Sequence, residues 1–181
     1  MMKSSILSFA SLLIIAGGAV AQGAAPAAGP NDAQIASIVV TANQVDIDAG
    51  KLAEAKGSTP DVKAFGKQMV TDHSGVNQQA VALVTKLKVT PEDNPTSQSL
   101  KSAGDTNVAN LKTLKGVAFD KAYIDNEVAF HQQVLDAVDK TLIPGASNEE
   151  LKALLVKARP MFVDHIEQAR KLQASVSKAT S

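Results

Sequence analysis

The sequence contains no cysteine and no tryptophan, and it has only one tyrosine and five phenylalanines among its 181 residues. Without cysteine the chain cannot form a disulfide, carry a lipid on a thiol or use a thiol as a nucleophile. With so few aromatic rings, it also lacks the stacking platforms on which proteins bind bases. The stability of the fold must therefore come from a core of aliphatic side chains.

An excess of charge of one sign is missing as well. The chain has 18 basic and 18 acidic residues, and the two signs are interspersed along it. Loss of an N-terminal segment containing Lys3 leaves 17 basic against 18 acidic residues, a net charge of −1. Nucleic-acid-binding domains concentrate basic charge on one face or stretch. We therefore expect no nucleic acid partner.

The N-terminus has the pattern of a secretion signal. Lys3 precedes an apolar run over residues 6–20, and Ala19-Val20-Ala21 places small residues where a signal peptidase cleaves. The run is shorter than the ~20 apolar residues that a transmembrane helix needs. We expect residues 1–21 to be a signal peptide cleaved after Ala21. The mature chain is then periplasmic or secreted, without a transmembrane span, and begins with an Ala/Gly/Pro tether over residues 22–30.

The remaining sequence predicts one all-α domain over residues 31–176, followed by a disordered tail over residues 177–181. Apolar residues recur at steps of three and four, which is the pattern of helices facing a common core, and no stretch has the alternation of a strand. We expect a four-helix bundle. Its long helices cover about residues 32–56, 60–88, 117–142 and 148–176, and a shorter amphipathic segment covers about residues 97–114.

Capping residues mark where these helices begin. Asn31 with Gln34 has the spacing of a capping box, and Thr59 precedes a proline at the first helical position. Ser147 with Glu150 is the expected cap of the last helix, after a break at Ile143-Pro144-Gly145. These caps divide the domain into its predicted helices.

Two features suggest how the helices are arranged. The connection over residues 89–116 is long enough to cross the bundle, so we expect the second and third long helices to run parallel, as in ferritin-like bundles. Gly50 and Gly66 are level across the first hairpin. They either allow the first two helices to approach closely or are unrelated, tolerated glycines.

The chain has three histidines, and each lies on the apolar stripe of a different long helix. They are His73, His131 and His165. Glu127 shares the face of His131 because it lies four residues earlier. Asp46 lies on the stripe of the first helix in one choice of register, and Asp48 in the other. In the parallel arrangement these groups fall within about one turn of the same depth.

Such a group offers nitrogen and carboxylate ligands from four helices, which suits one divalent ion of Zn, Cu, Ni or Fe. A buried hydrogen-bonded network without metal is equally consistent with the pattern. Asp72 and Asp164 each precede a histidine and should point about 100° away from it, toward solvent. A di-iron oxidase needs E-x-x-H segments, which the chain lacks. It also lacks a G-x-S-x-G turn and a glycine-rich phosphate loop, so we do not expect an enzyme.

Over about residues 36–175, the sequence resembles a bacterial protein family, the "domain of unknown function 4142" proteins. The resemblance depends on four segments in order: Asn43 to Ala53, Met69 to His73, Phe119 to Tyr123 followed by His131, and Pro160 with His165. It implies a ferritin-like four-helix bundle that is exported and often labelled an outer membrane protein, with no established activity. One departure is that relatives tend to have glutamate where this chain has Asp46 and Asp48, whose shorter side chains reach less far.

Two functional classes remain open. The first is a structural, stress-related or interaction bundle with a His/carboxylate cluster in its core and a protein partner in the cell envelope. The second is a ferritin-like protein that binds a divalent transition metal through His73, His131, His165 and Glu127 or Asp46. The sequence favours the first class slightly as a biological role.

Overall fold

The computed structural model of the protein describes residues 29–178, and helices are the only regular secondary structure in this range. The all-α class is therefore confirmed for the described part of the chain. The predicted signal peptide, residues 22–28 of the predicted tether and residues 179–181 of the predicted tail lie outside the described residues. None of the helices within residues 29–178 combines the length and the apolar run that crossing a membrane requires.

Five long helices make up the structure. They are α1 (Asp32–Lys56), α2 (Pro60–Leu87), α3 (Pro95–Thr113), α4 (Gly116–Ala137) and α6 (Glu149–Lys178). A π-helical turn, η1 (Val138–Leu142), and the three-residue α5 (Ile143–Gly145) extend α4. The helices lie close to their predicted positions. However, α3 is a fifth long helix of 19 residues rather than a short connecting segment.

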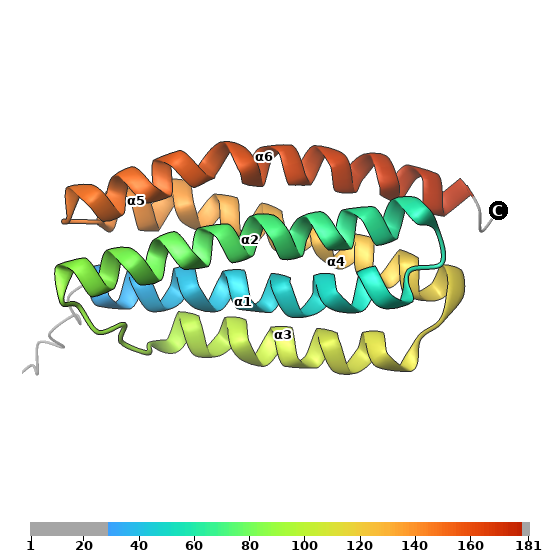
Figure 1. Ribbon diagram of the computed structural model, residues 1–181, viewed down its shortest axis with the longest axis horizontal. Coiled ribbons are helices and arrows are strands. Elements are labelled where there is room, and N and C mark those ends of the chain that lie inside the picture. Colours follow the sequence, from blue (N-terminus) through green and yellow to red (C-terminus); the bar gives the residue numbers. More distant parts are fainter. Residues whose placement is uncertain (1–28, 179–181) are drawn as a thin grey trace, which may run out of the picture.

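The helices run along one common axis (Figure 1). α1, α3 and α6 run in one direction, while α2 and α4 run in the other and are therefore parallel to each other. α3 carries the chain back along the side of α1, where a Cβ added to Gly104 would come within 2.5 Å of the Val45 side chain. The missing side chain at Gly104 lets α3 pack closely against α1, which is why it forms part of the bundle rather than a loose connection.

The helix starts follow the predicted capping pattern in two cases out of three. Asn31 and Gln34 form the capping box of α1, and the Thr59 side chain accepts a hydrogen bond at the start of α2. The prediction for α6 was wrong, because Asn148 and not Ser147 caps it. Its Oδ1 accepts from the N–H groups of residues 150 and 151, at 2.9 and 3.0 Å. The Ser147 N–H instead donates to the Asp32 carboxylate at 2.8 Å.

The predicted break at residues 143–145 was also wrong, since the chain stays helical through Gly145. The Ile143 N–H bonds to the carbonyl of Val138, five residues earlier, which is the wider spacing of a π-helix. Pro144 follows immediately and has no N–H to donate. The wider turn therefore lets the helix pass through the proline before it ends.

The first hairpin is held together by a close approach of two helix backbones. A Cβ on Gly50 would lie 2.8 Å from the Gly66 carbonyl oxygen, and a Cβ on Gly66 would lie 2.7 Å from the Ala53 Cβ. Real Cβ atoms are essentially never found so close to another heavy atom. Of the two alternatives for these glycines, the structure therefore supports the close approach of α1 and α2.

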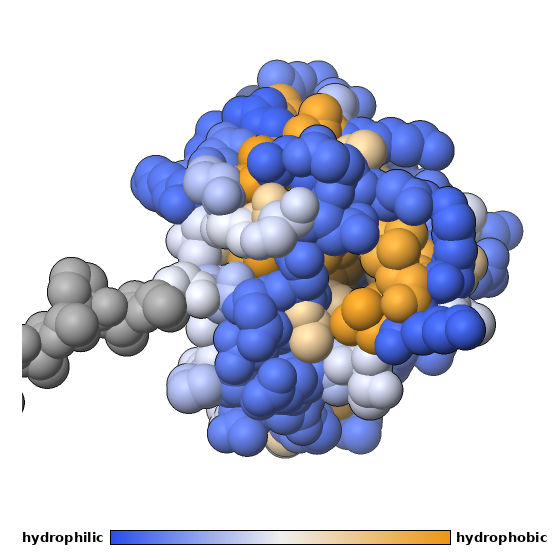
Figure 2. All heavy atoms as spheres, turned by 90° about the vertical axis from the view of Figure 1, so that its left-hand side faces the viewer, coloured by the Kyte–Doolittle hydropathy of each residue, from blue (hydrophilic) through white to orange (hydrophobic). Residues whose placement is uncertain are grey.

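The core consists of two apolar clusters, one toward each end of the bundle. One contains Ile35, Leu142 and Leu155 among others, and the other contains Phe65, Phe119 and Val176 among others. Seen from the end where α2 stops and α3 begins, hydrophilic side chains cover most of the surface, and hydrophobic ones show as patches at the top and on the right-hand side (Figure 2). Several buried polar residues, Asp46 and His73 among them, lie between the two apolar clusters.

Candidate functional site

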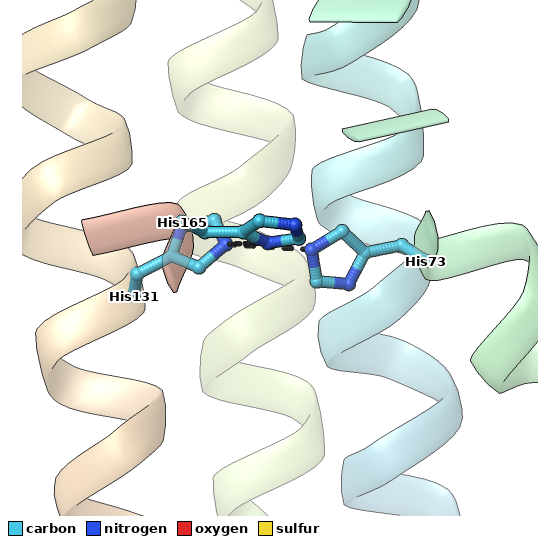
Figure 3. A group of neighbouring side chains, drawn as sticks. All are labelled: His73, His131 and His165. Carbon is cyan, nitrogen blue, oxygen red and sulfur yellow. Dashed lines mark hydrogen bonds between the residues drawn. The ribbon is translucent and has the colours of Figure 1, made fainter. Parts of the chain in front are cut away.

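The five predicted site residues come together at this middle level. Asp46 on α1, His73 on α2, Glu127 and His131 on α4, and His165 on α6 are each at most 1% exposed. Figure 3 shows the imidazoles of the three histidines pointing toward one another from three helices. We call these five residues the polar cluster. Because they lie on the inner stripes of four helices, their convergence follows from the packing of those stripes.

The ring nitrogens that face inward are close together. His131 Nε2 lies 3.3 Å from His73 Nε2 and 3.2 Å from His165 Nδ1. Asp46 Oδ2 lies 2.8 Å from His73 Nε2 and 3.3 Å from His131 Nε2. Two overlapping groups thus place possible ligand atoms within 4.8 Å of one another: the three histidines, and Asp46 with Glu127 and His131.

Each imidazole uses its outer nitrogen for a hydrogen bond. His73 Nδ1 lies 2.7 Å from Asn43 Oδ1, and the amide of Asn43 donates to the Val39 carbonyl at 2.7 Å. His131 Nδ1 lies 3.0 Å from the carbonyl oxygen of Glu127, and His165 Nε2 lies 3.0 Å from Asp72 Oδ2. All three partners are acceptors, so each neutral imidazole carries its proton on the outer nitrogen. The inner nitrogens then present lone pairs to the centre of the cluster.

Burial keeps two of these histidines neutral. Loss of solvent lowers the pKa of His131 to about 4, although the Asp46 carboxylate opposes this shift. Loss of solvent also lowers the pKa of His165, against the effect of its hydrogen bond to Asp72. Near neutral pH both rings are therefore uncharged, which is the form of imidazole that binds metal ions.

The two buried carboxyl groups behave in opposite ways. Burial opposes ionisation of Asp46, but the imidazoles of His73 and His131 outweigh it and bring the pKa of Asp46 below its ordinary value. Burial and the nearby Asp46 carboxylate raise the pKa of Glu127 well above its ordinary value. Burial and the proximity of Glu127 also raise the pKa of Tyr123. Asp46 is thus the stronger acid of the two, and Glu127 holds its proton to a higher pH than an ordinary glutamate.

Two polar residues outside the predicted set contact the cluster. Asp72 was expected to face solvent, and this was wrong: its side chain is 34% exposed, and its carboxylate accepts from His165 on α6. It does point away from His73 on its own helix, but that direction faces α6. Asn43 was missed, although it lies three residues before Asp46 and hence on the same helix face. Asp48 and Asp164 are exposed, so Asp46 is the inward-facing aspartate of α1.

The sequence match to a known family covers this entire site. A family model described as a domain of unknown function (DUF4142) matches residues 17–172. The chain belongs to the DUF4142 family. No curated protein and no solved structure matches it. The matched range of this DUF4142 protein contains all five residues of the polar cluster together with Asn43 and Asp72, so its function has to be argued from their geometry.

Proposed function

We propose that this DUF4142 protein binds one divalent transition-metal ion in the polar cluster, through His73, His131, His165 and Asp46. The observation that carries the proposal is the spacing of the inner ring nitrogens, 3.2 and 3.3 Å. Ligand atoms about 2.0–2.1 Å from a tetrahedral ion are about 3.3–3.4 Å from one another. Two of the six ligand–ligand distances of a tetrahedral site, from His131 Nε2 to His73 Nε2 and to His165 Nδ1, thus already have the expected length.

The hydrogen bonds of the outer nitrogens support the same proposal. Metal-binding histidines usually donate their second N–H to a carboxylate or a carbonyl oxygen, which fixes the ring and its tautomer. His165 donates to the Asp72 carboxylate, and His131 donates to a backbone carbonyl. Three lone pairs and one carboxylate oxygen that face one another repel unless a cation lies between them. A metal ion supplies that positive charge.

The donor set indicates which ions fit. Three imidazoles and one carboxylate suit Zn, Cu, Ni or Fe in the divalent state better than Ca or Mg, which prefer oxygen ligands. The raised pKa of Glu127 makes it a poorer anionic ligand than Asp46, so we assign the fourth position to Asp46. Four protein ligands fill a tetrahedral sphere and leave no open position for a substrate. The site therefore suits retention or carriage of an ion rather than catalysis.

The proposal includes an exported location and a ferritin-like arrangement. The N-terminal pattern over residues 1–21 supports export to the periplasm with cleavage after Ala21. The parallel course of α2 and α4 supports a ferritin-like four-helix unit formed by α1, α2, α4 and α6, in which α3 is the crossover. In this arrangement, each of the four helices contributes one ligand to the proposed metal site.

One contact favours a second candidate function, a structural or interaction bundle without metal. The 2.8 Å between His73 Nε2 and Asp46 Oδ2 is short for two ligands of one ion but ordinary for a hydrogen bond. In this case a single proton on the imidazoles replaces the ion and balances the charge of Asp46. The functional surface of the protein would then be a helix face that contacts a partner in the cell envelope.

Metal analysis by mass spectrometry distinguishes the two candidates. The protein is purified without a histidine tag, alongside His73→Ala, His131→Ala and His165→Ala, with exposed Asp164→Asn as control. We expect about one equivalent of transition metal in the wild type and the control, and loss of it in all three histidine variants. Absence of metal, with no rise in melting temperature on adding Zn, Cu, Ni or Fe, would reject metal binding and support the structural or interaction bundle.

A further inference from the structure

A cavity of about 70 Å³ lies in the half of the bundle between the polar cluster and α5. Every long helix contributes to its wall, and so does η1. Representative lining residues are Ala42, Val76, Leu100, Val138 and Phe162. Protein interiors are normally packed as closely as organic crystals, so a space of this size is an unusual feature of a small bundle.

The space exists because small side chains occur where large ones would fill it. Ala42 on α1, Ala137 on α4 and Ala158 on α6 all line the cavity. The π-helical turn adds Val138 and Leu142 to the wall. Such turns are rare and are frequently found at functional sites. The cavity thus results from features of three different helices rather than from one poorly packed residue.

The cavity offers few hydrogen-bond partners to a water molecule. A buried water needs two to four polar partners. Asn43 is the only buried polar residue on the wall, and its side chain is already bonded to His73 and to the Val39 carbonyl. The other two polar lining residues, Thr96 and Gln133, are exposed and mark an entrance between α3 and α4. The interior therefore favours an uncharged, apolar occupant.

We propose that this cavity is a binding site for one small, uncharged, apolar molecule that enters between α3 and α4. An apolar cavity of about 150 Å³ admits benzene or xenon. The cavity here has about half that volume, so it suits a molecule of gas size or a very short hydrocarbon. Its wall includes Phe162, whose ring centroid lies 5.7 Å from that of His73 and 5.9 Å from that of His131. The occupant thus lies next to the polar cluster, although its binding does not depend on a metal.

Xenon is the probe for the test, because it is apolar and scatters X-rays strongly. Crystals of the protein are pressurised with xenon, together with crystals of Ala42→Leu, in which the added side chain fills the cavity. Ala55→Leu is the matched control, since Ala55 is exposed on the same helix. We expect one xenon atom between Val138 and Phe162 in the wild type and in Ala55→Leu, and none there in Ala42→Leu.

A second measurement does not depend on the variants. In solution, dissolved xenon should shift the methyl NMR signals of Leu100 and Val138 in a saturable manner, while benzene should not, because it is too large. Ordered water in the cavity of the unpressurised crystal would overturn the proposal, as would xenon bound only elsewhere or methyl signals that do not respond. Saturable binding of benzene would overturn the size class. None of these outcomes depends on whether the polar cluster binds metal.

Discussion

Replacing Asp72 by asparagine tests the metal site through its outermost hydrogen bond. The Asp72 carboxylate accepts from His165 Nε2 at 3.0 Å, which leaves His165 Nδ1 free to face the centre of the cluster. Asparagine keeps an oxygen that can accept the same hydrogen bond, so the substitution removes mainly the negative charge. Mutating the residue that holds the second ring nitrogen of a metal-binding histidine typically weakens metal binding about 10–100-fold.

The exposure of Asp72 places the expected effect at the lower end of that range. Its side chain is 34% exposed, so solvent screens the charge. We expect about a 10-fold loss of Zn²⁺ affinity, which corresponds to about 1.4 kcal/mol. A competition titration of Zn²⁺ against a chromophoric chelator at fixed pH measures it. Asp164→Asn is the matched control, because Asp164 also precedes a histidine but is exposed. Equal losses in both variants, or none in Asp72→Asn, would refute the charge of Asp72 as a determinant of the site.

Three further predictions concern stability. Because the pKa of His131 is lowered to about 4, against about 6.5 in the unfolded chain, the unfolded state binds the proton first as the pH falls. The metal-free protein should therefore lose on the order of 3 kcal/mol between about pH 6.5 and 4 through this residue. Urea titrations should show this loss relative to His131→Gln, and parallel pH profiles would contradict it. Burial raises the pKa of Glu127. The folded state therefore loses stability through this residue as the pH rises above the ordinary pKa of glutamate. The stability of Glu127→Gln relative to the wild type should then increase as the pH rises above about 4.5. The variant should still bind metal; loss of metal would make Glu127 a ligand. Gly66→Ala places a Cβ 2.7 Å from the Ala53 Cβ and should cost about 1–3 kcal/mol. Gly75→Ala has no neighbouring atom within 4 Å and should add up to about 1 kcal/mol; thermal melts that reversed this order would disprove the close approach.

The sequence predicts the helices well because their signals are local. Apolar spacing and capping residues act within a few positions, so the starts of α1 and α2 at Asp32 and Pro60 follow directly from Asn31 and Thr59. The course of the chain around Pro144 does not follow, because a proline can end a helix or be accommodated by a π-helical turn. Packing against the neighbouring helices decides between these outcomes, and a single sequence does not show that packing.

The members of the polar cluster were predictable for a related reason. A polar residue on an apolar stripe must be buried, and His73, His131 and His165 each satisfy that rule. Asp72 does not lie on a stripe, so its contact with His165 depends on which helix lies beside α2 and at what height. That is tertiary information. The same limit applies to the cavity, which arises from alanines on three helices that only the assembled bundle brings together.

The position of the polar cluster between two apolar clusters also bears on how the chain selects one packing. A long helix with a uniform aliphatic stripe can slide along its neighbours by one turn, about 5.4 Å, and still bury apolar surface. Here such a slip would move His73 or Asp46 against aliphatic side chains and leave its former partners buried and unpaired. Unpaired buried polar groups are costly. The polar cluster therefore sets the axial register of four helices, and it does so whether or not an ion is bound.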